Sequence, residues 1–121
     1  MPTVLHMCTA GEWAAAQERG VYRAGSLDDV GFVHCSDRGT VHLPANRVFA
    51  GRGDMVLLEV EIAALDVPVR WEPADPPMPG PSPWFPHIYG LIPVEAVVAV
   101  HDFPPGADGT FRLPDSLAKA V

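Results

Sequence analysis

The sequence predicts an α+β domain in which helices pack on a strongly bent sheet or pair of sheets. Apolar stretches typical of strands outnumber the candidate helices about two to one, and these helices cluster in the first half of the chain. With 121 residues the chain fits one domain, because two separate cores would leave each half too small to be stable. We therefore expect residues 1–121 to form a single domain.

The chain opens with a predicted strand and helix. Residues 3–8 are apolar around one histidine, which predicts an N-terminal strand. Thr9 and Glu12 have the spacing of a capping box, and Gly20 suits a helix end, so we expect the first helix between them. Residues 26–29 add at most one further helical turn.

A second strand and a short helix are predicted next. Residues 31–36 are again apolar around one histidine, as in the first strand. The short helix has Pro44 in its first turn, where proline costs no helical hydrogen bond. We expect Ala45, Val48 and Phe49 to be buried, and a glycine two positions later to end the helix.

The second half of the chain is predicted to consist of strands and turns. Residues 55–62 show the strongest strand pattern, with clear alternation from Leu58. Further strands are predicted at residues 69–72, 85–90 and 97–103, and a last edge strand at residues 110–113 after a turn at residues 106–109.

Proline is unusually frequent, and it concentrates in one segment. The chain has 14 prolines, and seven of them lie in residues 73–86. Proline fixes φ and removes a backbone donor, so this segment is neither a helix nor a central strand. Because few residues follow it, we interpret it as a loop within the domain. Long loops are often functional, so we expect it to border a cleft and to be mobile at its centre.

Composition excludes several classes of function. The 8 basic and 15 acidic residues give a net charge of −7, which argues against nucleic acid as a partner. No apolar run approaches the ~20 residues needed to span a bilayer, and the first 30 residues lack the pattern of a signal peptide. The two cysteines are too few for a disulfide framework. We expect a cytoplasmic protein with no membrane association, and its oligomeric state stays open.

Three histidines lie where chemistry is plausible. His6 and His34 each fall inside an apolar strand, and His87 directly follows the proline-rich loop. A histidine in such a setting needs a hydrogen-bond partner, so each is either satisfied by a carbonyl in the core or part of a site. We expect all three to converge on one concave surface with Tyr89. The other two histidines, His42 and His101, are predicted to lie at the surface.

The remaining polar candidates are weaker. No tight pair of metal ligands occurs, so no metal site is predicted. Cys35 directly follows His34, so the two side chains leave a strand on opposite faces and do not pair. Glu72 is a candidate acid or base, or else an exposed carboxylate at a strand end. Asn46 and Arg47, on the short helix, either contact a ligand or are simply solvated.

The sequence resembles a family of small bacterial domains of unknown function over nearly its whole length. The motifs that carry the resemblance are Leu5-His6 with Thr9, Gly20-x-Tyr22, Gly31-Phe32-Val33-His34-Cys35-Ser36, Val56-Leu57-Leu58-Glu59-Val60, Arg70-Trp71-Glu72-Pro73 and Phe85-Pro86-His87-Ile88-Tyr89-Gly90. That family is grouped with the ADP-ribosyltransferase fold, and its pattern looks closest to the branch that contains the RNA 2′-phosphotransferases.

The resemblance implies two split antiparallel sheets around a cleft for NAD. The phosphotransferases use a histidine on each of two early core strands, which match His6 and His34. Glu72 is the candidate for the glutamate that the transferases carry on a third strand. The basic residues that bind the RNA phosphate have no clear match in this acidic chain.

Two hypotheses of function follow from the resemblance. The first is an ADP-ribosyl- or phosphoryl-group transferase acting on an NAD-like or ADP-ribose-containing small molecule, with catalytic His6, His34 and Glu72. Its ligand would be bound by further polar and aromatic side chains, namely Ser36, Asn46, Arg47, His87 and Tyr89. The alternative is a non-catalytic, nucleotide-binding module with a degenerate active site. Fold analogy alone does not decide between them.

Overall fold

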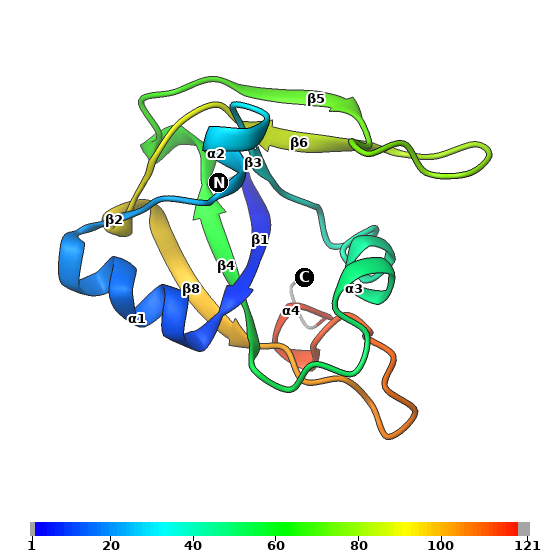
Figure 1. Ribbon diagram of the computed structural model, residues 1–121. Helices are drawn as coiled ribbons and strands as arrows, with labels where there is room; N and C mark the ends of the chain where they lie inside the picture. Colours follow the sequence, from blue (N-terminus) through cyan, green and yellow to red (C-terminus); the bar gives the residue numbers. More distant parts are fainter. Residues whose placement is uncertain (1, 119–121) are drawn as a thin grey trace.

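The structure, a computed structural model, describes residues 2–118 and has an α+β fold with three small antiparallel sheets (Figure 1). The central sheet has the order β1–β4–β8, with β1 at Thr3–Thr9, β4 at Met55–Glu61 and β8 at Val97–Asp102. The second has the order β3–β6–β5, with β3 at Val33–His34, β6 at Trp84–Ile88 and β5 at Val69–Pro73. The third pairs β2 (Val21–Tyr22) with β7 (Ile92–Pro93).

Four α-helices and two 3₁₀ turns complete the described chain. The helices are α1 (Ala10–Arg19), α2 (Ser26–Asp29), α3 (His42–Val48) and α4 (Asp115–Ala118), and the 3₁₀ turns are η1 (Ile62–Ala64) and η2 (Val94–Ala96). Among residues 2–118, no helix has the length and apolar character needed to cross a membrane.

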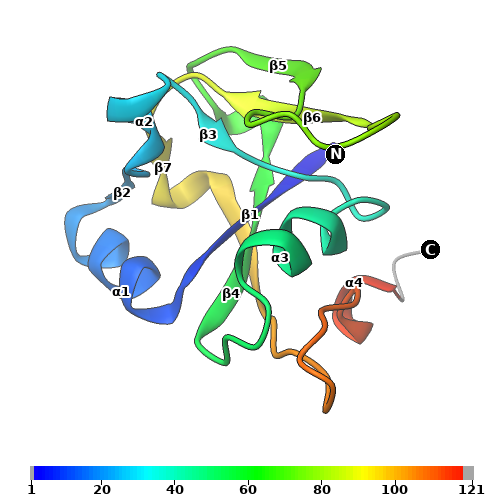
Figure 2. The same cartoon turned by 45° about the vertical axis from the view of Figure 1, so that its right-hand side comes forward.

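Strand β4 separates two hydrophobic cores. It lies between β1 and β8, and both Leu57 and Leu58 are fully buried. Because side chains alternate along a strand, these neighbours point to opposite faces of the sheet. Leu58 belongs to the core beneath α1, whereas Leu57 belongs to a core covered by α3 and the C-terminal segment. Figure 2 shows the two helices on either side of the central strands.

The first helix forms where the sequence predicts it. The Thr9 side chain accepts a hydrogen bond from the Glu12 backbone, and the Glu12 side chain accepts one from the Thr9 backbone, so the capping box is confirmed. Gly20 ends the helix with a left-handed backbone (φ 79°), which glycine adopts without steric cost. Ala16 is buried on the face that meets the core.

The strand predicted at residues 31–36 is regular only at Val33–His34. Its last residue forms an isolated bridge to the central sheet instead: Leu5 and Ser36 exchange two backbone hydrogen bonds of 2.8 Å. Ser36 therefore joins the second sheet to the first. The structure has three sheets where the resemblance implied two, since residues 21–22 and 92–93 pair separately.

Two predictions on local structure are wrong. Residues 110–113 are irregular rather than an edge strand, because Thr110 bonds to Asp108 in the preceding turn and the Phe111 backbone bonds to the side chain of Asn46. Val48 is 64% exposed rather than buried, because it borders an open cavity.

Gly90, which follows β6, offers a test of this packing. An added Cβ would lie 2.5 Å from Cγ1 of Val67, a short side chain that cannot swing away. Gly90→Ala is expected to lower the free energy of unfolding by about 1–3 kcal/mol, the usual cost of overpacking. Gly25→Ala is the matched control, because nothing lies within 4 Å of its added Cβ. Equal urea midpoints for the two variants would contradict the packing described.

Candidate ligand-binding site

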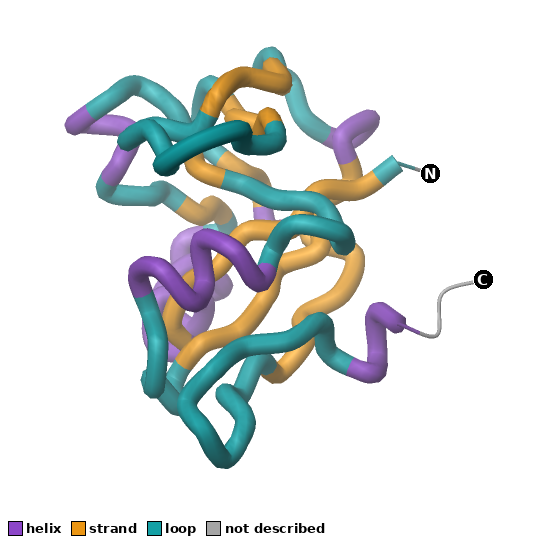
Figure 3. The backbone as a smooth tube through the Cα atoms, turned by 90° about the vertical axis from the view of Figure 1, so that its right-hand side faces the viewer, coloured by secondary structure: helices purple, strands orange, loops and turns teal. Residues whose placement is uncertain are grey.

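A cavity of about 340 Å³ lies where β1, β3 and β6 meet α3 and the loop after β5. The cavity is lined by five side chains that the sequence predicts as catalytic or ligand-binding residues: His6, His34, Ser36, Arg47 and His87. Most of the remaining wall is apolar and includes Met7, Phe49, Met78 and Phe85. Figure 3 views this side of the molecule, where loops make up much of the surface.

Strand register explains why the polar groups meet. In the β3–β6 pair, His34 lies directly opposite His87. Side chains two positions apart on a strand share a sheet face, so Phe85 points to the same side as His87. Ser36 lies beyond the end of β3 and also lines the cavity. The β5–β6 register places Glu72 opposite Phe85 and therefore on this face as well.

His87 is the polar side chain that the structure holds most firmly. It is only 2% exposed, and its ring stacks on Phe32 with the centroids 4.0 Å apart. Its Nδ1 lies 2.8 Å from Oε1 of Glu72. Every fully buried side-chain nitrogen or oxygen of residues 2–118 has a hydrogen-bond partner, whereas no described residue bonds to Nε2 of His87. Nε2 therefore reaches the cavity that His87 lines.

The contact with Glu72 determines which ring nitrogen of His87 carries a proton. Hydrogen bonds from Tyr89 (2.6 Å) and from His87 hold the pKa of Glu72 below its usual value. The same contact with Glu72 raises the pKa of Tyr89, which stays a donor. An ionised carboxylate only accepts, so Nδ1 of His87 carries a proton, and Nε2 is an acceptor whenever the ring is neutral. Neither Glu72 nor Tyr89 lines the cavity, so both act on it through His87.

Both ring nitrogens of His6 are occupied by other groups of the protein. Nδ1 lies 2.6 Å from the carbonyl oxygen of His34, and Nε2 lies 2.8 Å from the hydroxyl of Tyr22. Burial lowers the pKa of His6 to about 4, so the ring is neutral at physiological pH. His6 thus forms part of the cavity wall while its polar atoms hold β1 against β2 and β3.

His34 and Arg47 hold the proline-rich loop against the cavity. Nε2 of His34 lies 2.8 Å from the carbonyl oxygen of Asp75. The Arg47 guanidinium donates to the carbonyl oxygens of Pro76 (3.2 Å) and Pro77 (3.1 Å). The loop was expected to border a cleft, and residues 74–76 do line this cavity. The sequence did not single out Asp75, the one carboxylate in the lining.

The surroundings of Asn46, Cys8 and Cys35 are typical of residues that stabilise the fold. Asn46 lies outside the cavity lining, and its amide exchanges hydrogen bonds of 3.1 and 2.6 Å with the backbone of Phe111. Burial raises the pKa of the Cys8 thiol to about 12 and also raises that of Cys35, so neither is a ready nucleophile. No three His, Cys, Asp or Glu side chains of residues 2–118 come together as metal ligands would.

The expectation that His101 lies at the surface is wrong. Its side chain is only 11% exposed, and it lies 2.9 Å from Glu59 and 2.7 Å from Ser116. Ser116 is far along the chain and close only in the fold, so local sequence gives no signal for this contact.

The chain belongs to the DUF952 family, described as a protein of unknown function, whose model matches residues 7–100. It is similar to the protein CC0527 from Caulobacter crescentus. The crystal structure of CC0527 is 32% identical with a TM-score of 0.80, covering 97% of this chain and 99% of that one. A solution NMR structure of CC0527 is 29% identical with a TM-score of 0.79, covering 99% and 100%. No curated protein matches the chain.

The ionised state of Glu72 gives a pH-dependent prediction. Because its folded pKa lies below the ordinary value of 4.5, its stabilising effect is complete above that pH and is lost as the pH falls through the folded pKa. The difference in melting temperature between the wild type and Glu72→Gln should therefore be constant near neutral pH and shrink below about pH 4.5.

Glu18→Gln, which removes an exposed carboxylate on α1, is the control, and its difference from the wild type should stay flat. A Glu72→Gln difference that stayed constant or grew in acid would contradict the hydrogen-bonding arrangement.

Proposed function

We propose that this protein binds an NAD- or ADP-ribose-like ligand in the cavity of His34, Ser36, Arg47 and His87, and transfers its ADP-ribosyl or phosphoryl group. The observation that supports this most is His87, whose Nδ1 is held by Glu72 while Nε2 reaches an apolar cavity. A histidine oriented by a carboxylate is a common general acid–base arrangement.

The size and chemistry of the cavity suit part of a nucleotide. Its 340 Å³ lies at the small end of the usual range for ligand pockets, about 300–1,000 Å³, so it suits a nucleoside-sized group. Apolar and aromatic walls favour a flat ring. Arg47 has five N–H donors and uses one on each of Nη1 and Nη2 for the loop, which leaves donors for a diphosphate at the mouth.

In a transfer reaction, the acceptor oxygen would form a bond to the ribose carbon or to phosphorus, and the bond from that atom to its leaving group, nicotinamide in the case of NAD, would break. Nε2 of His87 would take the proton of the acceptor hydroxyl. The carboxylate of Glu72 would then stabilise the imidazolium that forms. In this proposal Glu72 orients His87 and does not contact the reacting carbon of the ligand. Ser36, which is 2% exposed, would contact the ligand through its hydroxyl.

One observation favours the alternative of binding without transfer. Oε1 of Glu72 is shared by His87 and Tyr89, and the carboxylate lies outside the cavity. The one carboxylate in the lining, Asp75, belongs to an exposed loop. A binding module would keep the polar cavity and lack a carboxylate fixed beside the reacting carbon.

The wider setting follows from composition. The net charge of −7 favours a small-molecule ligand over nucleic acid, and two free, buried cysteines are compatible with a reducing cytoplasm. The placement of the cavity between two antiparallel sheets supports an ADP-ribosyltransferase-like arrangement in a single domain.

Calorimetry with NAD and ADP-ribose tests the proposal. His87→Ala should weaken binding by about tenfold or more, because it removes a hydrogen-bonding group that faces the ligand. Arg47→Ala should weaken binding of ADP-ribose but not of adenosine, which has no diphosphate. His42→Ala is the control, since His42 does not line the cavity.

Chromatography of the reaction mixtures separates the two functions. Release of nicotinamide from NAD that requires His87 indicates transfer, whereas binding without release indicates the module. If neither ligand bound, or if His87→Ala bound both unchanged, the proposal would be wrong.

A further inference from the structure

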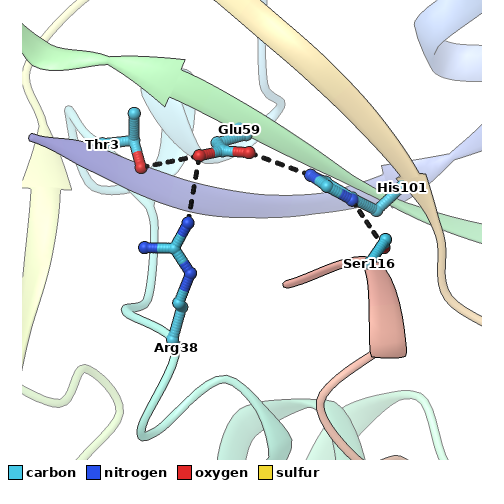
Figure 4. A network of polar contacts seen from close by, with 5 residues as sticks. All are labelled: Thr3, Arg38, Glu59, His101 and Ser116. Atoms are coloured by element: carbon cyan, nitrogen blue, oxygen red, sulfur yellow. Dashed lines mark hydrogen bonds and ion pairs between the residues drawn. The ribbon is translucent and has the colours of Figure 1, made fainter. Parts of the chain in front are cut away.

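A second polar cluster joins β4, β8 and α4 (Figure 4). None of its residues lines the cavity of His6, His34 and His87, called the histidine cavity below. Nδ1 of His101, on β8, lies 2.7 Å from the hydroxyl of Ser116, and Nε2 lies 2.9 Å from Oε1 of Glu59. Glu59 is 14% exposed, so its carboxylate is largely removed from water. Serine, histidine and glutamate are thus linked in a chain of two hydrogen bonds.

The second oxygen of Glu59 is also held. Oε2 accepts a hydrogen bond of 3.0 Å from Thr3 and lies 3.4 Å from the guanidinium of Arg38. Burial alone would raise the pKa of Glu59, but the hydrogen bonds from His101 and Thr3 outweigh it, and the pKa lies below its usual value. The carboxylate is therefore ionised and anchored from two sides.

These contacts define the tautomer of His101. An ionised carboxylate only accepts, so Nε2 of His101 carries the proton that Glu59 receives. Whenever the ring is neutral, Nδ1 is an acceptor, and the Ser116 hydroxyl donates to it. A base held by an anion and bonded to a hydroxyl is the arrangement that activates a serine nucleophile.

We propose that Ser116, His101 and Glu59 form a nucleophilic serine site that cleaves small carboxylic esters. Ser116 is exposed at the start of α4, and the buried Leu117 beside it anchors the segment. Ser116 and His101 line a cavity of about 640 Å³ that shares no residue with the histidine cavity. The site is independent of the proposed function.

The reaction proceeds in two steps. The Ser116 oxygen attacks the ester carbonyl carbon while its proton passes to Nδ1 of His101. The bond to the leaving alcohol breaks, and His101 returns that proton to the alcohol, leaving an acyl-serine. Water then attacks the acyl group with His101 again as base, which releases the acid and restores the serine. Glu59 is a positioning residue throughout.

The charges around this cavity indicate the preferred ester. The lining carries two carboxylates, Asp102 and Asp115, and one guanidinium, that of Arg112. This guanidinium also lies 4.0 Å from the carboxylate of Asp108. An excess of negative charge disfavours an anionic substrate. Neutral or cationic esters should therefore react faster than anionic ones, as p-nitrophenyl acetate and p-nitrophenyl hemisuccinate would show.

Labelling with a fluorophosphonate tests the site on the whole protein. The Ser116 oxygen should displace fluoride from phosphorus, and mass spectrometry should find one adduct in the tryptic peptide of residues 113–119, where Ser116 is the one hydroxyl residue. Ser116→Ala should abolish the adduct. His101→Ala should slow labelling about 100-fold or more, the usual contribution of a general base, and added imidazole should restore part of the rate.

Two comparisons separate catalysis from a purely structural role. Glu59→Gln should lower kcat for p-nitrophenyl acetate with little change in KM, whereas lost structure would lower the melting temperature instead. Ser82→Ala, in the proline-rich loop, is the control and should label like the wild type. The proposal is overturned if the folded wild type is not labelled, if Ser82 is labelled as fast as Ser116, or if imidazole does not restore labelling of a folded His101→Ala.

Discussion

The exchange of two backbone hydrogen bonds between Leu5 and Ser36 is the contact on which the candidate site depends. Each bond is 2.8 Å long, and together they join β1 of the central sheet to the residues after β3. The side chain of His6 crosses the same junction to the carbonyl of His34. Because His34 is fixed opposite His87 by the β3–β6 register, this junction also sets where His87 lies relative to β1.

The burial of His6 is understandable in the light of this junction. A neutral imidazole has one donor and one acceptor, and the His34 carbonyl and the Tyr22 hydroxyl match both. An apolar residue at position 6 would leave that carbonyl and hydroxyl without a partner in a low-dielectric interior, which is costly. His6 therefore stabilises the arrangement of sheets around the cavity even where it contacts no ligand.

The local features of the fold could be predicted from sequence, and the contacts between distant segments could not. The capping box of Thr9 and Glu12 depends on a spacing of three residues, and the structure confirms it. The expectation that three histidines share one surface with Tyr89 rested on their apolar strands; all three histidines line the cavity, and Tyr89 does not. In contrast, Ser36 to Leu5, Asn46 to Phe111 and His101 to Ser116 are set by strand register and chain packing, which no local pattern encodes.

The two polar clusters share one hydrogen-bonding pattern, with the roles of the two ring nitrogens exchanged. Each cluster holds a carboxylate whose pKa is lowered by hydrogen bonds, and each carboxylate binds one histidine. Glu72 binds Nδ1 of His87, and Nε2 of that ring faces an apolar cavity. Glu59 binds Nε2 of His101, and Nδ1 of that ring faces the hydroxyl of Ser116. The carboxylate thus selects which nitrogen accepts a proton. The free nitrogen of His87 needs a ligand to supply its partner, while His101 already has one in Ser116, so the first site calls for binding and the second for a reactive group of the protein itself.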